Sequence, residues 1–186
     1  GTDWTLAGFL DTRENVLAGI SMDAGVIGDP NTYVPRADDM FIVAIGDPKF
    51  KRKLVAPLRL KGATFVSLRT SVRMADRVRH GAAVFGDCAR ISVDTTLGDY
   101  VFIGDDCVIG HDVEIADYAH IGTRCFIAGN ARIEEDALVH PMSSIAIGVR
   151  VGKGATVGLG SVVFHDVPDS TTVIGNPARR LERSRN

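Results

Sequence analysis

From residue 91 onward, an aliphatic residue recurs every six positions without interruption. The series is Ile91, Leu97, Ile103, Ile109, Ile115, Ile121, Ile127, Ile133, Val139, Ile145, Val151, Val157 and Val163. A small or β-branched residue stands four positions after each of them, from Thr95 to Val167. A period of six fits neither the alternation of a simple strand nor the turn of an amphipathic helix. The pattern therefore predicts a structure built from one repeated unit.

Hexapeptide repeats are typical of a parallel β-helix. Each hexad would form one flat face, and three faces would close a triangular coil of about 18 residues. The aliphatic and the small residue of each hexad are expected to point inward. The sequence thus predicts a mainly β fold, with a parallel β-helix over residues 66–167. Cys107 and Cys125 fall in the same inward column, and we expect Cys88 to join them as core packing.

Residues 1–65 do not follow the repeat and are predicted to form a small α/β subdomain with Rossmann-like order. Strands are expected in 4–11, 25–30, 40–46 and 64–68, with a helix over 49–60. Asp47 and Pro48 suit the cap and first position of that helix, and Met40–Gly46 has the composition of a buried parallel strand. Residues 168–186 leave the repeat and are predicted to form a C-terminal tail.

Charge and composition exclude several classes of protein. The chain has 21 Lys and Arg against 23 Asp and Glu, which argues against a nucleic-acid binder held by a basic surface. Its apolar runs fall short of the about 18–20 residues that a membrane span needs. Its first residues lack the features of a signal peptide. The three cysteines form neither a disulfide framework nor a metal-binding pattern. We therefore expect a cytoplasmic protein without a metal site.

The hexads, the preceding α/β segment and the closing Val173–Ile174–Gly175–Asn176–Pro177–Ala178 together resemble one family. It is the left-handed β-helix (hexapeptide-repeat) acyltransferases of the sialic acid O-acetyltransferase type, with the greatest similarity to the nucleotide-amino-sugar N-acetyltransferases. The resemblance implies acetyl-CoA as co-substrate and a nucleotide-linked amino sugar as acceptor, in surface polysaccharide biosynthesis. It also implies a homotrimer with active sites at the subunit interfaces.

The segment from Cys107 to Gly122 carries the most specific part of the resemblance. In the family, a histidine followed by an acidic residue is the catalytic pair, and a second histidine nine residues later contacts acetyl-CoA. His111, Asp112 and His120 match that spacing. Imidazole titrates near neutrality, so His111 suits a general base, and Asp112 can orient its ring.

The resemblance implies further contacts at less specific positions. Backbone contacts to the coenzyme are expected near Gly129, Pro141 and Leu159, and contacts on the nucleotide side at Asp11 and Gly46. Members of the family usually begin with a strand and a glycine-rich loop, whereas this sequence starts at what would be their second strand. The α/β subdomain is therefore expected to be a truncated version of theirs.

His111 and His120 are nine residues apart, which is half a coil. On one triangular prism they would lie on nearly opposite sides. We therefore predict that they meet only across a cleft between two prisms, which favours the trimer.

Three other functions compete with this interpretation. A γ-class carbonic anhydrase needs three histidines on zinc, with two of them in an HxxxxH spacing, and no two histidines here have it. O-acetylation of a sugar hydroxyl remains an alternative, because one histidine base can serve an amine or a hydroxyl. A non-catalytic β-helix that binds a partner is the third.

Overall fold

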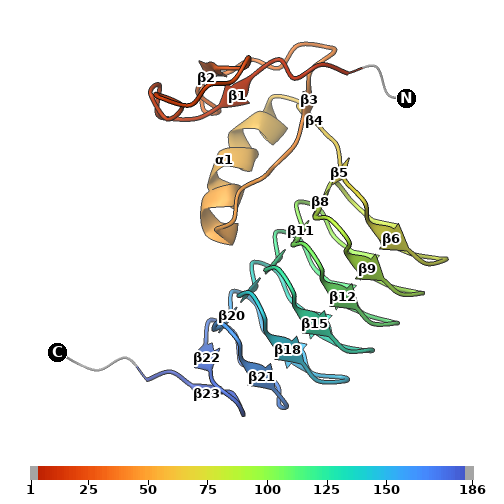
Figure 1. The fold of residues 1–186 in the computed structure, drawn as a ribbon. Coiled ribbons are helices and arrows are strands. Elements are labelled where there is room, and N and C mark those ends of the chain that lie inside the picture. Colours follow the sequence, from red (N-terminus) through yellow and green to blue (C-terminus); the bar gives the residue numbers. More distant parts are fainter. Residues whose placement is uncertain (1–3, 183–186) are drawn as a thin grey trace. The chain divides into compact units, whose positions relative to one another are not determined.

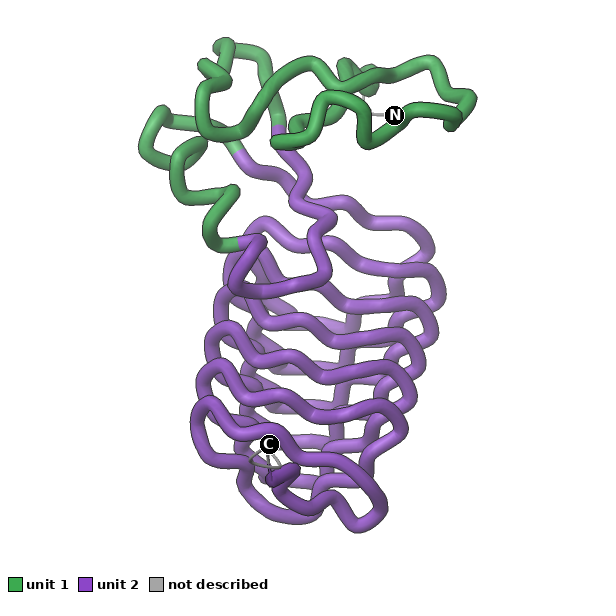
Figure 2. Tube along the Cα trace, turned by 90° about the vertical axis from the view of Figure 1, so that its left-hand side faces the viewer, with its two compact units in different colours: residues 1–40, 52–64 green, residues 41–51, 65–186 purple. Residues whose placement is uncertain are grey.

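The computed structural model describes residues 4–182. The chain forms two compact units (Figure 2). The first holds the residues up to Met40 together with Arg52–Thr64, and the second holds Phe41–Lys51 together with the chain from Phe65 onward. The division passes through the helix Pro48–Leu60, so that its first residues belong to the second unit.

Between residues 4 and 65 the chain forms four short strands and one helix. The strands β1 (Phe9–Leu10) and β2 (Val26–Gly28) pair in parallel, and β3 (Met40–Phe41) pairs with β4 (Thr64–Phe65). The predicted buried strand over 40–46 is thus mostly wrong: only two of its residues are in a strand, and Met40 is 56% exposed. A two-stranded sheet gives each strand a single neighbour, which is too little to bury an apolar run.

Helix α1 (Pro48–Leu60) begins and ends where the sequence predicts. Asp47 Oδ1 accepts a hydrogen bond from the Phe50 N–H at 2.6 Å, which caps the first turn. Gly62 follows the helix with a φ of +79°, a conformation that glycine adopts without steric cost.

From residue 68 onward the chain winds into a three-sided prism (Figure 1). The "β12 sheet" contains β6 (Arg73–Met74), β9 (Arg90–Ile91), β12 (Val108–Ile109), β15 (Phe126–Ile127), β18 (Ser144–Ile145) and β21 (Val162–Val163). The "β13 sheet" contains β7 (Arg79–His80), β10 (Thr96–Leu97), β13 (Glu114–Ile115), β16 (Arg132–Ile133) and β19 (Arg150–Val151). The "β14 sheet" contains β5 (Leu68–Arg69), β8 (Val84–Phe85), β11 (Phe102–Ile103), β14 (His120–Ile121), β17 (Leu138–Val139), β20 (Thr156–Val157), β22 (Thr172–Ile174) and β23 (Arg179–Arg180).

Consecutive coils stack in parallel register. Ile103 lies opposite Ile121, which in turn lies opposite Val139, so the chain advances by one coil per 18 residues. The mainly β fold with a parallel β-helix is confirmed, and it is consistent with the left-handed β-helix that the resemblance implies. The chain stays in the prism beyond Val167, because β22 pairs with β20 within the predicted tail.

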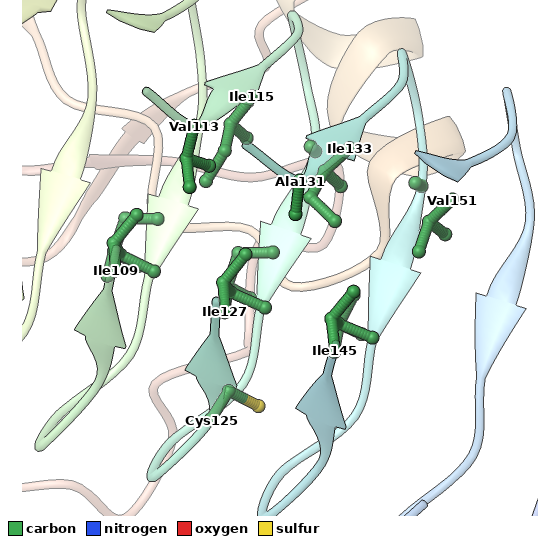
Figure 3. Packing of buried hydrophobic residues seen from close by; sticks show 14 of the residues in the cluster. Ile109, Val113, Ile115, Cys125, Ile127, Ala131, Ile133, Ile145 and Val151 are labelled. Atoms are coloured by element: carbon green, nitrogen blue, oxygen red, sulfur yellow. The ribbon is translucent and has the colours of Figure 1, made fainter. Parts of the chain in front are cut away.

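The two inward columns form one continuous core (Figure 3). Every aliphatic residue of the six-residue series is at most 3% exposed. The polar members of the small column satisfy their hydrogen-bonding groups inside the prism. Ser143 Oγ donates to the Gly158 carbonyl at 2.9 Å, and Cys107 Sγ donates to the Gly122 carbonyl at 3.0 Å. Cys107 and Cys125 are therefore core residues, as predicted.

Cys88 is exposed, so its predicted place in the core column is wrong. Ala89 takes the inward position instead and is fully buried. Coils are 17 residues apart where Leu97 lies opposite His80, and 18 apart where Ile103 lies opposite Phe85. The repeat thus lacks one residue between His80 and Phe85, which moves Cys88 to a corner with a φ of 58°.

Replacing Ile115 with alanine is expected to lower the free energy of unfolding by about 2–5 kcal/mol, because the change leaves a cavity in a close-packed column. Ile115 is only 2% exposed. Its neighbour Glu114 points outward, and Glu114→Ala should change stability by less than about 0.5 kcal/mol. Urea unfolding of both variants measures the difference, and equal effects would contradict the inward and outward assignment.

Candidate active site

His111 lies at the corner where the chain passes from the β12 sheet to the β13 sheet. Its Nδ1 is 2.7 Å from Asp112 Oδ2, and both side chains are 53% exposed. Asp112 has a φ of 56°, a left-handed conformation that aspartate tolerates better than most residues. The repeat therefore places the predicted pair on the surface of the prism, free to meet a substrate.

The contact with Asp112 determines which nitrogen of the His111 ring carries the proton. An ionised carboxylate can only accept a hydrogen bond, so Nδ1 must donate. In the neutral ring, Nε2 then carries a lone pair and can accept a proton. This is the arrangement of a general base oriented by a carboxylate, which also stabilises the imidazolium that forms.

Gly129 occupies the same corner one coil further along, directly against the His111 ring. A Cβ atom at this position would lie 2.6 Å from His111 Nε2 and 2.8 Å from Cε1. The His111 carbonyl also accepts a hydrogen bond from the Asn130 N–H at 2.9 Å. The absence of a side chain at Gly129 therefore permits the observed position of the imidazole.

His120 lies on the β14 sheet, on another side of the prism from His111. Its ring stacks on Phe102, with centroids 4.5 Å apart and an interplanar angle of 2°. A Cβ at Gly46 would lie 3.7 Å from His120 Cε1. His120 Nδ1 is buried and has no hydrogen-bond partner among the described residues. The structure thus brings His120 together with Gly46.

The pKa of His120 is lowered from 6.5 to about 4, first by burial and then by the nearby Lys51 and His140. Between these two pH values the folded protein binds fewer protons at His120 than the unfolded chain. The free energy of unfolding should therefore fall as the pH drops through this window. His120→Gln should remove that part of the slope, as measured by urea unfolding at several pH values. The same slope in the variant and the original protein would contradict the assignment.

Pro141 and Leu159 share the corner between the β14 sheet and the β12 sheet, one coil apart. Pro141 packs against Gly122, where a Cβ would lie 2.6 Å from the proline Cδ. Leu159 is 64% exposed. These two residues and the His111–Gly129 corner therefore lie along opposite edges of the β12 sheet.

Asp11 belongs to the first compact unit, where its carboxylate pairs with Arg13 at 3.0 Å. The hydrogen bonds from Arg13 lower the pKa of Asp11 below its ordinary value. Within the second unit, the predicted site residues form three groups on different parts of the prism. These are His111 with Asp112 and Gly129, His120 with Gly46, and Pro141 with Leu159. Their roles in binding and catalysis stay predictions.

A polar depression of about 480 Å³ borders Asp112 on the side of the β13 sheet. It is lined by Asp112, Glu114, Asn130, Arg132, Gly148, Arg150 and Asp166. Both signs of charge are present, with Arg132 3.7 Å from Glu114 and Arg150 3.0 Å from Glu134. Such a surface can hold a polar ligand next to the His111–Asp112 pair.

Lys51 in α1 is fully buried, which the sequence does not predict. Its Nζ donates a hydrogen bond to the Tyr100 carbonyl at 2.8 Å. Nothing in the sequence distinguishes this lysine from its basic neighbours Lys49 and Lys53, because its burial depends on a partner far along the chain.

Residues 94–129, which contain the His111–Asp112 corner and His120, match the family model described as bacterial transferase hexapeptide (six repeats). Residues 94–129 are therefore similar to the hexapeptide repeats of bacterial transferases. A parallel β-helix such as this prism is the structure that hexapeptide repeats typically form. Within residues 4–182, no helix is both long and apolar enough to cross a membrane.

Curated relatives match short stretches of the chain. Serine acetyltransferase from Bacillus licheniformis is 45% identical over 42 residues, which is 23% of this chain and 19% of the relative. The 2,3,4,5-tetrahydropyridine-2,6-dicarboxylate N-acetyltransferase from Staphylococcus aureus is 45% identical over 47 residues, 25% of this chain and 20% of the relative. The chain spans about a fifth of the length of these relatives, and both are acetyltransferases.

Solved structures match nearly the whole chain. PerB from Caulobacter crescentus, in complex with CoA and GDP-perosamine, has a TM-score of 0.84 and 27% identity, covering 94% of this chain and 84% of PerB. The acetyltransferase domain of PglB from Neisseria gonorrhoeae, in complex with acetyl coenzyme A, also has a TM-score of 0.84 and 27% identity, covering 94% and 85%. WeeI from Acinetobacter baumannii shares the fold at 24% identity and a TM-score of 0.83, covering 94% and 85%.

Proposed function

We propose that the protein is an acetyl-CoA-dependent acetyltransferase that acts on the amino group of a nucleotide-linked amino sugar. The observation that carries the proposal is the exposed His111–Asp112 pair, with 2.7 Å between His111 Nδ1 and Asp112 Oδ2. The likeness to PerB, a protein bound to CoA and GDP-perosamine, and to the PglB domain bound to acetyl coenzyme A supports the substrates. A role in surface polysaccharide biosynthesis and a cytoplasmic location belong to the same proposal.

The geometry suits the chemistry of acetyl transfer. The amine nitrogen of the acceptor attacks the thioester carbonyl, and His111 Nε2 takes the proton that the nitrogen loses. The tetrahedral intermediate then expels the CoA thiolate, which is protonated to give the free thiol. Asp112 holds the ring in the required tautomer and stabilises the imidazolium. The polar depression beside Asp112 offers a place for the acceptor sugar.

His111 and His120 lie on different sides of one prism, so a site that uses both needs a second chain. We propose a homotrimer with such sites at its interfaces. Exposed apolar side chains on the β12 sheet and along its two edges support this: Phe126, Met142, Ile147, Leu159 and Phe164. Exposed apolar surface of this kind marks interaction sites.

Light scattering on the purified protein tests the trimer. The proposal expects a mass of three times 19.9 kDa. Phe126→Glu, on a side chain that is 48% exposed, should lower that mass and leave the fold intact by circular dichroism. A single-chain mass for the original protein would contradict the proposed assembly.

Thiol release from acetyl-CoA tests the activity. A panel should contain amino sugars linked to guanosine, uridine and thymidine diphosphates, together with their free nucleotides as controls. The proposal expects release with at least one amino sugar and none with the nucleotides alone.

O-acetylation of a sugar hydroxyl is the alternative acceptor chemistry. Mass spectrometry of the product, before and after mild alkaline treatment, distinguishes a stable amide from a labile ester. Release of thiol with none of these acceptors would instead favour a non-catalytic binding module.

A further inference from the structure

Lys51 is the most unusual charged residue of the second unit, because its side chain is fully buried. Burying an ammonium group is costly unless hydrogen bonds and opposite charge compensate. Here Nζ donates to the Tyr100 carbonyl at 2.8 Å, and Asp47 and Asp136 are close enough to favour the charged form. Lys51 takes part in none of the proposed catalytic steps, so its burial needs another explanation.

The segment from Gly46 to Lys51 is attached to the prism at both ends. At one end Gly46 lies against the His120 ring, where a Cβ would be 3.7 Å from Cε1. At the other end the Lys51 hydrogen bond reaches Tyr100, at the corner before β11. β11 carries Phe102, the ring on which His120 stacks. The lysine therefore fixes the segment that covers one side of His120.

We propose that Lys51 is a positioning residue: its hydrogen bond to Tyr100 fastens the Gly46–Lys51 segment to the prism and so holds Gly46 against the His120 ring. Its importance for acetyl transfer rests on the proposed function, in which His120 contacts the acetyl donor. The effect of Lys51 on His120 itself does not depend on the proposed function.

The charges around His120 fit this role. The imidazolium is disfavoured first by burial and then by the positive charges of Lys51 and His140, so the pKa falls to about 4. Burial lowers the pKa of Lys51 to about 8, against the opposing influence of Asp136 and Asp47. At neutral pH the lysine is therefore mostly charged and the histidine neutral. A neutral imidazole offers one donor and one acceptor, and it adds no positive charge beside the lysine.

Titration of His120 by NMR, without any substrate, tests the proposal. Lys51→Met keeps the length of the side chain and removes its charge, whereas Lys51→Arg keeps a cation. Lys49→Met is the matched control, because Lys49 is an exposed lysine of the same helix. The pKa of His120 should rise toward 6.5 in Lys51→Met and stay low in the other two variants. An unchanged His120 pKa in Lys51→Met would overturn the proposal.

A titration of the original protein tests the same proposal without relying on the folding of a Lys51 variant. As Lys51 loses its proton near pH 8, the ring signals of His120 should show a second step that the Lys49→Met variant retains. A smooth signal without that step would also overturn the proposal.

Kinetic measurements separate a failure of the Lys51 proposal from a failure of the proposed acetyltransferase function. Lys51→Met should raise KM for acetyl-CoA several-fold with a smaller change in kcat. If the original protein releases no thiol with any acceptor, the proposed function fails, whereas the His120 titration still decides the role of Lys51.

Discussion

Replacing His111 with alanine is expected to lower kcat for acetyl transfer by about 10²–10⁴-fold, the usual contribution of a general base. His111 is exposed, and its Nδ1 contacts only the Asp112 carboxylate among the hydrogen bonds described above, so the fold should survive the change. Thiol release with saturating acetyl-CoA and acceptor measures the effect. KM for both substrates should change much less than kcat.

The chain provides a matched control for this variant. His165 is followed by Asp166 and occupies the same corner three coils further along the prism. Asp166 Oδ1 accepts a hydrogen bond from the Arg150 backbone N–H at 2.8 Å, so the second pair has a structural aspartate. His165→Ala should leave kcat unchanged. Equal losses in the two variants, or a fully active His111→Ala variant, would contradict the assignment of the base.

Replacing Gly129 with alanine should lower kcat by about 100-fold, because a small displacement of a catalytic group has an effect of this size. The added Cβ would lie 2.6 Å from His111 Nε2, so the imidazole has to move. The φ of Gly129 lies outside the left-handed region, so the backbone tolerates alanine and the fold should persist. Thiol release measures the loss, and the melting temperature checks the fold.

A double variant separates the effect on His111 from a direct contact with the coenzyme. If Gly129→Ala acts by displacing His111, it should cause no further loss of kcat in the His111→Ala background. Fully additive losses would show that Gly129 acts independently of the histidine.

The prism could be predicted almost completely from the sequence, because one local rule repeats along it. Each hexad needs an aliphatic residue inside and a small residue four positions later, and both columns are buried as that rule requires. The position of Cys88 could not be predicted in the same way. A residue missing between His80 and Phe85 shifts the register, and the sequence pattern does not reveal on which side of Cys88 the shift falls.

The N-terminal strands were less predictable, because an apolar run does not reveal how many strands will cover it. Met40–Gly46 has the composition of a buried strand, yet β3 has a single partner and Met40 is mostly exposed. The helix was predictable, since its cap at Asp47 and its end near Gly62 are local signals.

In the candidate site, too, local features could be predicted from the sequence and contacts between distant segments could not. His111 and Asp112 are adjacent in sequence, so their pairing at a corner could be predicted from the repeat. The surroundings of His120 could not, because they depend on Gly46 and Lys51 from outside the repeat. Sequence patterns therefore reveal sites built within one coil and miss those assembled from distant segments.

In the proposed function, this protein transfers an acetyl group to the amine of a nucleotide-linked sugar. The most direct test is thiol release by the original protein with two acceptors that differ in one group, an amino sugar and its hydroxyl counterpart on the same nucleotide. We expect release with the amino sugar, an amide product, and little or no release with the hydroxyl sugar. Equal or greater release with the hydroxyl sugar, or none with either over the full nucleotide panel, would contradict it.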